Sequence, residues 1–172
     1  GVFRDGRARI ADSSKVVFHA DGRTASVALT TFRDGTLTIA TNGKPDAAIN
    51  MARAQGNRAV PVGADEITMT FLGALPLAYA PGARRAAIIG HGSGLTTHVL
   101  LGSPVIEQVD VIEIEPEMIR AARSFGPRVA RAYNDPRART YVEDARAFFA
   151  SAPQRYDILI SEPSNPWVSG VS

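Results

Sequence analysis

The strongest constraint on the fold is an alternation of short apolar runs with helical stretches that begins at residue 65. The runs are continuous rather than alternating, which is typical of strands buried on both faces of a parallel sheet. They occupy residues 86–89, 109–114, 140–142 and 156–160. Helices are predicted at residues 65–79 (where Pro76 is expected to kink or end the helix), 95–101, 116–125 and 145–150. This order predicts an α/β domain with helices on both faces of the sheet.

The first sixty residues have a different pattern and predict β-hairpins. Two runs rich in β-branched residues, 24–32 and 36–40, flank Asp34-Gly35, which is a strong hairpin signal. A second turn is predicted at residues 42–45, and the mixed polar segment 50–63 is predicted to be a linker. The expected organisation is a small N-terminal β domain with its linker at 1–62, followed by a Rossmann-like domain at 63–172.

Composition and charge exclude several classes of function. The chain has no cysteine, so it can form neither a disulfide nor a thiolate metal site. Its 19 basic residues are scattered and nearly balanced by 17 acidic ones, which gives nucleic-acid binding no support. No apolar stretch approaches the roughly 18 residues needed to span a bilayer, so we expect no membrane contact from this segment itself. The spacing of the three histidines is not that of a metal site, and we expect no metal.

The two ends of the chain indicate a fragment. The sequence begins at Gly1 rather than at a methionine, and it stops at Ser172 soon after the last strand-like run. We therefore expect a piece of a longer product, in which the parallel sheet is truncated at its C-terminal side.

A glycine-rich segment lies between the first apolar run and the helix that follows it. Gly90, Gly92 and Gly94 are spaced two apart, a pattern that permits a tight turn and a close approach of the backbone to a ligand. The dinucleotide fingerprint would require a glycine where the chain has Leu95, and no lysine follows the turn as in a phosphate-binding loop. The alternative is a plain strand-to-helix turn. His91 lies inside the segment and is expected to flank the ligand.

Three acidic residues follow three successive strands, where ligands bind in open α/β sheets. Glu113 is placed to accept hydrogen bonds from ribose hydroxyls, Asp144 from an adenine amino group, and Glu162 faces the same crevice. The alternatives are a solvated strand end for Glu113, a helix N-cap for Asp144 and an exposed loop acid for Glu162. Glu115 is expected to be a solvated strand end or the N-cap of the next helix. The set predicts a nucleoside pocket, of the S-adenosylmethionine type rather than the nicotinamide type.

An ordered set of motifs along the chain resembles the spermidine synthase family, the polyamine aminopropyltransferases. The resemblance is closest to bacterial relatives in which this domain is fused to membrane segments. The motifs are the Asn42-Gly43-Lys44 turn, the glycine loop at 90–94, Val111-Ile112-Glu113-Ile114, Asp135-Pro136-Arg137, Glu143-Asp144-Ala145-Arg146, Tyr156-Asp157-Ile158-Leu159-Ile160 and Ser161-Glu162-Pro163-Ser164-Asn165-Pro166-Trp167.

The resemblance implies a fold, a reaction and a setting. The fold is a small β domain followed by a Rossmann-like sheet of the S-adenosylmethionine-dependent methyltransferase type. The reaction is transfer of an aminopropyl group from decarboxylated S-adenosylmethionine to a diamine such as putrescine, with release of 5′-methylthioadenosine. The donor is a co-substrate, and no tightly bound cofactor is expected. The partners are then a small amine and the nucleoside donor, in a homodimer or homotetramer located in the cytoplasm, either free or as the cytoplasmic domain of a membrane protein.

The resemblance also assigns roles to residues. Glu162 falls at the catalytic acid, and Asn165 falls where the family has a second, amine-binding aspartate. The donor-binding positions are Gly90, Gly92, Ser93, Gly94, Glu113, Ile114, Asp144 and Ala145.

Three departures from the family pattern weaken the amine side of the predicted site. Ser93 stands where the family has an aspartate, Asn165 replaces another, and Thr68-Met69-Thr70 replaces a Tyr-His/Gln-Glu cluster. Because an unpaired ammonium is costly to bury, a diamine site needs several carboxylates. Two alternatives therefore stand beside aminopropyl transfer. One is an enzyme that uses intact S-adenosylmethionine, such as a methyltransferase, and the other is a non-catalytic nucleoside-binding domain of a membrane protein.

Overall fold

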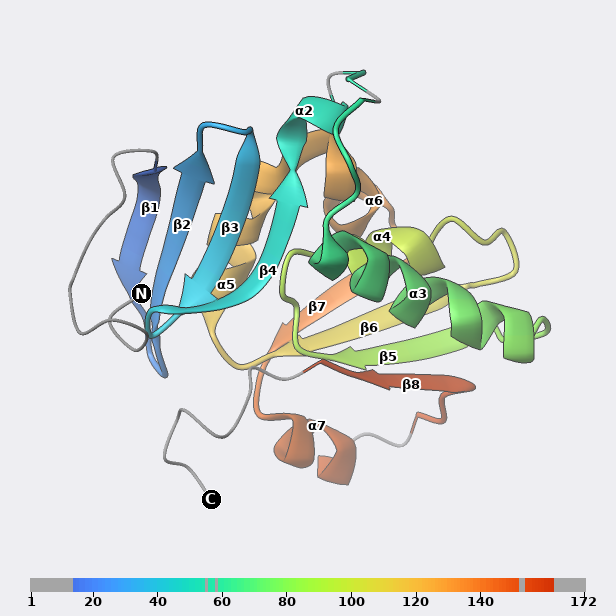
Figure 1. Ribbon diagram of the computed structural model, residues 1–172. Coiled ribbons are helices and arrows are strands. Elements are labelled where there is room, and N and C mark those ends of the chain that lie inside the picture. The colour runs from blue at the N-terminus through green and yellow to red at the C-terminus, as the bar shows by residue number, and fades with distance from the viewer. Residues whose placement is uncertain (1–13, 55, 58, 152–153, 163–172) are drawn as a thin grey trace.

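A computed structural model describes residues 14–54, 56–57, 59–151 and 154–162, which form two four-stranded sheets with helices around them (Figure 1). The N-terminal sheet is antiparallel and its strands follow chain order. They are β1 (Ser14–Asp21), β2 (Ser26–Phe32), β3 (Thr36–Thr41) and β4 (Lys44–Asn50).

The β2–β3 hairpin forms where the sequence predicts it. Gly35 has a φ of 82°, which a residue with a side chain rarely adopts, and the Thr36 amide donates to Asp34 Oδ1 over 2.9 Å. The segment after the next turn differs from the prediction. Residues 44–50 form β4 rather than a turn and the start of a linker, and a short helix, α2 (Met51–Ala54), follows it.

The second sheet is parallel, in the order β7-β6-β5-β8, which confirms the predicted fold class. Its strands are β5 (Arg85–Ile89), β6 (Gln108–Glu113), β7 (Ala138–Val142) and β8 (Ile158–Ser161). The helices are α3 (Ala64–Tyr79), α4 (Leu95–Leu100), α5 (Pro116–Ala122), the 3-10 segment η1 (Arg123–Val129), α6 (Ala130–Asn134) and α7 (Ala145–Ser151).

Helices cover both faces of the parallel sheet, as the continuous apolar runs predict. Leu72 of α3 and Leu100 of α4 pack against Ile88 and Val111 on one face, while Phe148 of α7 packs against Ile112 on the other (Figure 1). The predicted helix at 65–79 is confirmed as α3, with Pro76 inside it. The helix expected at 116–125 ends earlier, at Ala122, and η1 follows, in which Gly126 has a φ of 52°. No helix in the described ranges is long and apolar enough to cross a membrane.

The N-terminal sheet shares a core with the helices that follow it in the chain. Buried side chains of the N-terminal sheet, including Leu29 and Ile39, pack in the same cluster as Leu95, Met118 and Phe125 of the second domain. A buried polar contact also joins them, because Glu66 at the start of α3 accepts from the Asn50 amide over 3.0 Å and pairs with Arg128. The N-terminal sheet is therefore fixed beside the edge of the parallel sheet at which the strands end.

Candidate active site

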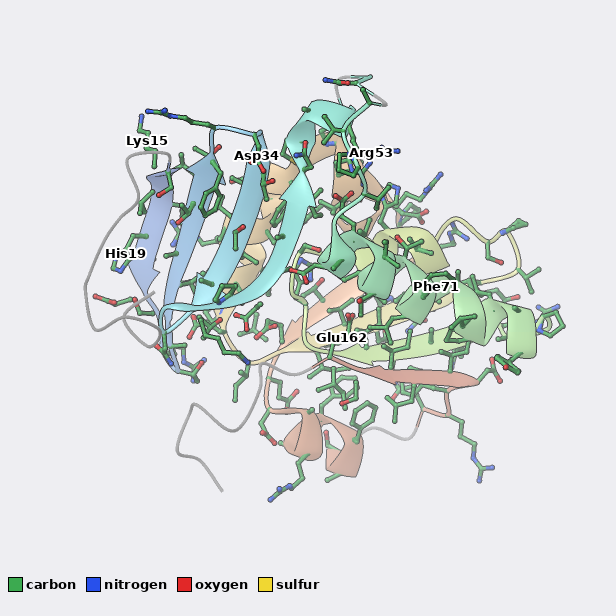
Figure 2. The ribbon with its side chains drawn as sticks, in the orientation of Figure 1. Lys15, His19, Asp34, Arg53, Phe71 and Glu162 are labelled. Atoms are coloured by element: carbon green, nitrogen blue, oxygen red, sulfur yellow. The ribbon has the colours of Figure 1, made fainter. Side chains whose placement is uncertain are left out.

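A pocket of about 420 Å³ opens between the two sheets, at the carboxyl ends of the parallel strands. Figure 2 shows Glu162 there, near the centre of the molecule. The wall includes most of the glycine loop, the ends of β6 and β8, the start of α7 and the start of β4. Its residues are Lys44, Pro45, Asp46, Ala47, Met69, Ile89, Gly90, His91, Gly92, Ser93, Leu95, Thr96, Ile112, Glu113, Ile114, Met118, Glu143, Asp144, Ala145 and Glu162.

The glycine loop turns sharply between β5 and α4. Gly90, Gly92 and Gly94 have φ angles of 92°, 49° and 83°, in the left-handed region that favours glycine. Gly90 and Gly92 line the pocket, whereas Gly94 lies behind it as the N-cap of α4. A Cβ atom at Gly94 would lie 3.3 Å from both the Ala132 Cβ and the His91 Nε2 atom. The loop therefore needs glycine at Gly94 for packing and at Gly90 and Gly92 for its path along the pocket.

Glu113 is held by the backbone at the end of β6. It is only 8% exposed, and its two carboxylate oxygens accept from the amides of His91 (2.8 Å) and Glu115 (2.9 Å). Burial raises the pKa of Glu113, and the backbone hydrogen bonds from Glu115, His91 and Ile114 oppose this rise. Each carboxylate oxygen has a second lone pair, so Glu113 can accept hydrogen bonds from a ligand while these two amides fix its orientation.

Asp144 lies directly before α7, on the wall of the pocket. It lines the pocket together with Ala145, and its Oδ1 accepts from the Ala147 amide over 2.9 Å in the first turn of α7, which confirms the capping alternative. Ile114, a half-exposed residue just beyond β6, lies on the same wall. The structure thus gathers Ile114, Asp144 and Ala145 in the same pocket wall as Glu113.

Glu162 follows β8 and is half-buried rather than an exposed loop acid. Its amide donates to the Ile89 carbonyl over 2.8 Å, which fixes the backbone beside the glycine loop. Burial raises the pKa of Glu162, and a hydrogen bond from the Thr96 side chain opposes the rise. A carboxylate in this state is a stronger base than one in water, which suits it to accept a proton inside the pocket.

Ser93 does not supply a charge to the pocket. Its side chain is completely buried, its hydroxyl donates to the Met69 sulfur over 3.0 Å, and the same oxygen accepts from the Leu95 amide over 3.2 Å. The hydroxyl therefore serves the packing of α3 against the loop. The other predicted amine-binding residue, Asn165, lies outside the described residues.

His91 lines the pocket, and the Nε2 side of its ring is engaged by protein. The ring is buried, and its Nε2 lies 2.7 Å from the Tyr133 hydroxyl, which in turn donates to the Ile119 carbonyl. Burial, helped by the charge of Arg123, lowers the pKa of His91 to about 4, so the ring is neutral at pH 7. His91 contributes to the site through its backbone amide, which holds Glu113.

Sequence reasoning missed the part of the pocket that comes from β4. Lys44, Pro45, Asp46 and Ala47 line it consecutively. Opposite them, Ile39 pairs with Ala47 and Ala40 pairs with Pro45, so Asp46 is the extra residue of a β-bulge. Bulges redirect side chains and are frequent beside active sites. The Asn42-Gly43 turn was the one signal of this hairpin in the sequence, but it does not reveal what the hairpin faces.

Among the described residues, no group of three or more histidine, aspartate or glutamate side chains is placed to hold a metal ion. The fold is of the methyltransferase-like class, with a pocket at the carboxyl ends of its parallel strands. The chain belongs to the spermine/spermidine synthase family, because the model of the spermine/spermidine synthase domain matches residues 66–170.

Individual relatives agree with this placement. Over 93 residues the chain is 37% identical to putrescine N-methyltransferase 2 of Nicotiana tabacum, and over 96 residues it is 30% identical to a polyamine aminopropyltransferase of Clostridium perfringens. These matches cover 54% and 56% of this chain but only 26% and 34% of the relatives. The chain thus spans about a third or less of the curated relatives that it matches.

The solved structures show the same fold. The crystal structure of spermidine synthase from Thermotoga maritima superposes with a TM-score of 0.72 at 18% identity, covering 88% of this chain and 48% of that one. A spermidine synthase in complex with the transition-state analogue AdoDATO also superposes with a TM-score of 0.72, at 18% identity, covering 88% of this chain and 47% of that one.

Proposed function

We propose that the protein transfers an aminopropyl group from decarboxylated S-adenosylmethionine to a diamine such as putrescine. The observation that carries the proposal is the pocket itself, in which a glycine loop, an acid fixed by backbone amides and a half-buried acid converge at the ends of β5, β6 and β8. Family membership and the aminopropyltransferase relative support the same chemistry.

In this proposal the Rossmann-like half of the pocket holds the donor as a nucleoside. Glu113 accepts hydrogen bonds from the ribose hydroxyls and Asp144 accepts one from the adenine amino group, while Gly90 and Gly92 allow the backbone to lie close to the ligand. Hydrogen bonds to a charged acceptor contribute roughly 1.5–3 kcal/mol each. The nucleoside is thereby fixed, and its sulfonium is directed toward Glu162.

Transfer then needs a nucleophile and a leaving group in line. The amine nitrogen forms a bond to the methylene carbon beside the sulfonium, the carbon–sulfur bond breaks, and its electron pair stays on sulfur to give neutral 5′-methylthioadenosine. The amine must lose a proton, and Glu162 accepts it. Sulfonium is already a good leaving group, so the enzyme works mainly by holding the two reactants together and by removing this proton.

A second candidate is methyl transfer from intact S-adenosylmethionine to the same kind of amine. Three observations favour it. The Ser93 hydroxyl is engaged with Met69 and Leu95, so this position offers no carboxylate to a cationic aminopropyl tail. Lys44 on the opposite wall is a cation, which suits the carboxylate of a methionine tail. Putrescine N-methyltransferases are among the relatives.

The two reactions are separated by their products. The full-length protein is incubated with putrescine and either donor, and the products are identified by mass spectrometry. Spermidine with methylthioadenosine supports aminopropyl transfer, and N-methylputrescine with S-adenosylhomocysteine supports methyl transfer. If neither forms while calorimetry still detects methylthioadenosine binding, the domain is a non-catalytic nucleoside-binding domain and both enzyme proposals fail.

Assembly and location complete the proposal. We propose a homodimer or homotetramer, which analytical ultracentrifugation of the full-length protein would test, because a monomer at micromolar concentration contradicts it.

We also propose a cytoplasmic location for this domain, since its donor and acceptor are intracellular metabolites. Fractionation of cells with an antibody against the domain, combined with protease protection in intact spheroplasts, tests the location.

A further inference from the structure

Glu115 is a buried acid to which the reaction gives no role. It directly follows the Glu113-Ile114 pair and is only 2% exposed, so it is not the solvated strand end that the sequence allowed. Its Oε1 accepts from the Glu117 amide over 3.1 Å, which confirms the alternative of an N-cap for α5. Its other oxygen points away from α5, to the N-terminal sheet.

That second oxygen, Oε2, holds the turn between β1 and β2. It accepts three hydrogen bonds, from the Thr24 amide (2.8 Å), the Thr24 hydroxyl (2.8 Å) and the Ala25 amide (3.1 Å). Burial alone would raise the pKa of Glu115, but the hydrogen bonds from Thr24, Glu117 and Ala25 outweigh it and lower the pKa. Glu115 is therefore an anion at pH 7, and charge-assisted bonds to an anion are stronger than neutral ones.

The contact is also sterically tight. A Cβ atom at Gly22 would lie 2.0 Å from Glu115 Oε1, closer than any two such atoms can approach, and no positive φ requires glycine there. Because Gly22 has no side chain, the Glu115 carboxylate can lie directly against the turn.

Hydrogen bonds also join the β1–β2 turn to the β3–β4 hairpin, which lines the pocket. The Ser26 amide donates to Asn42 Oδ1 over 3.0 Å, and the Asn42 amide donates to the Ser26 carbonyl over 2.8 Å. Figure 1 shows both turns at the same end of the N-terminal sheet. Asn42 and Gly43, with φ angles of 49° and 78°, then lead directly into the wall segment Lys44–Ala47.

A second set of bonds joins Glu115 to the donor site. Its own amide donates to Glu113 over 2.9 Å, and Glu113 is the acid proposed to hold the ribose. We infer that Glu115 is a positioning residue that fixes the wall segment Lys44–Ala47 over the donor pocket, by anchoring the two N-terminal turns to the same strand end that carries Glu113. This inference deepens the proposed function and rests on it for the identity of the donor.

Two variants disturb the contact between the Glu115 carboxylate and the β1–β2 turn, one by changing the acid and one by changing the turn. Glu115→Gln keeps the size of the side chain but has only one acceptor oxygen, so it must give up either the turn or the cap of α5. Gly22→Ala leaves Glu115 in the sequence and displaces its carboxylate. In both variants we expect the Kd for methylthioadenosine and the KM for the donor to rise about tenfold, while kcat stays within twofold. Such a rise with an unchanged kcat indicates a loss of binding rather than of chemistry.

Two matched controls make the same kinds of substitution at positions outside these contacts. Glu117→Gln deletes a charge from the same turn of α5, where Glu117 pairs with Arg120, and Gly82→Ala adds a methyl group at a position with no atom within 4 Å. Both controls should keep the wild-type Kd within twofold. If the two test variants are folded and also keep the wild-type Kd and KM, the inference is wrong.

Hydrogen exchange separates this inference from the proposed function, because it needs no ligand. We expect faster exchange at residues 24–26 and 42–47 in Glu115→Gln and Gly22→Ala, with the amides of β5 and β6 unchanged. If the wild type does not bind methylthioadenosine, the proposed function fails and exchange alone decides the positioning role. Wild-type exchange at 42–47 in both folded variants overturns that role, whatever the ligand.

Discussion

The two acids on either side of the glycine loop are supported in different ways. Glu113 is held by the backbone amides of His91 and Glu115, so its orientation is set by the chain path. Glu162 is fixed through its own backbone, while its carboxylate receives a side-chain hydrogen bond from Thr96. Burial raises the pKa of both acids, and only at Glu113 do backbone amides oppose the rise.

We expect this difference to divide the roles of the two acids, so that one holds the ligand and the other accepts a proton. An acid fixed by two amides keeps its geometry when a nucleoside binds, which is what a ribose-binding group requires. An acid with a raised pKa whose carboxylate is bonded by a side-chain hydroxyl, and not by two backbone amides, exchanges a proton more readily, which is what a general base requires. Variants that affect one acid and spare the other test whether the roles are divided in this way.

The largest effect is expected from Glu162→Gln. The amide retains the shape of the side chain but cannot accept the proton of the amine, and a general base contributes roughly 10²–10⁴-fold to a rate. We expect kcat to fall about a thousandfold while the Kd for methylthioadenosine stays within twofold. Glu107→Gln, which removes a surface acid paired with Arg84, is the control. A Glu162→Gln enzyme with more than a tenth of the wild-type kcat would falsify the assignment.

Glu113→Gln should have the opposite effect, a large rise in Kd and a smaller loss in kcat. The variant replaces a charged acceptor by a neutral amide, one side of which can no longer accept from a backbone amide. We expect the Kd for methylthioadenosine to rise by roughly 10–100-fold, equivalent to about 1.4–2.8 kcal/mol, with a smaller loss in kcat at saturating donor. Calorimetry measures the first quantity and steady-state kinetics the second. Equal losses in kcat for Glu113→Gln and Glu162→Gln would mean that the two acids act as one unit.

The division of the pocket also marks how far sequence reasoning could reach. The glycine loop and the acids at 113, 144 and 162 follow strands that the apolar runs reveal, and topology alone brings strand ends to one edge. Their roles stay predictions, although the structure gathers them in one pocket. Local pattern was sufficient for these residues because each belongs to its own strand or to the turn after it.

The part of the pocket wall that comes from β4 could not be predicted from local sequence patterns. The sequence did not predict β4, because Pro45 cannot donate a hydrogen bond to a sheet and the glycine before it signals a turn. The Glu115 contact joins residues about 90 positions apart, and no local pattern reports a pairing at that separation. A bulge that exposes Asp46 to the pocket is likewise a property of strand register and not of composition.

The pH dependence of stability should have opposite slopes for two of the acids. The folded-state pKa of Glu162 is raised above 4.5, so its ionisation disfavours the fold as the pH rises past that value. The pKa of Glu115 is lowered below 4.5, so it stabilises the fold above that pH and the stabilisation is lost as the pH falls through the folded-state pKa.

Urea unfolding between pH 3.5 and 7.5 measures these slopes. Relative to wild type, Glu162→Gln should gain stability with rising pH, whereas Glu115→Gln should lose it. Parallel curves for Glu162→Gln and Glu115→Gln would show that the two carboxylates do not differ in environment as the hydrogen bonds indicate.

The smallest effect on donor binding is expected from Tyr133→Phe, behind the pocket. The variant deletes the hydroxyl that joins the His91 ring to the Ile119 carbonyl, and one lost hydrogen bond with a buried partner costs about 1–3 kcal/mol of stability. Tyr79→Phe, at a residue that is 88% exposed, is the matched control and should leave stability unchanged. Because His91 holds Glu113 through its backbone amide and not through its ring, the KM for the donor should change by less than about threefold. A tenfold rise in KM in a folded Tyr133→Phe enzyme would show that the His91 ring, and not the chain path alone, sets the position of Glu113.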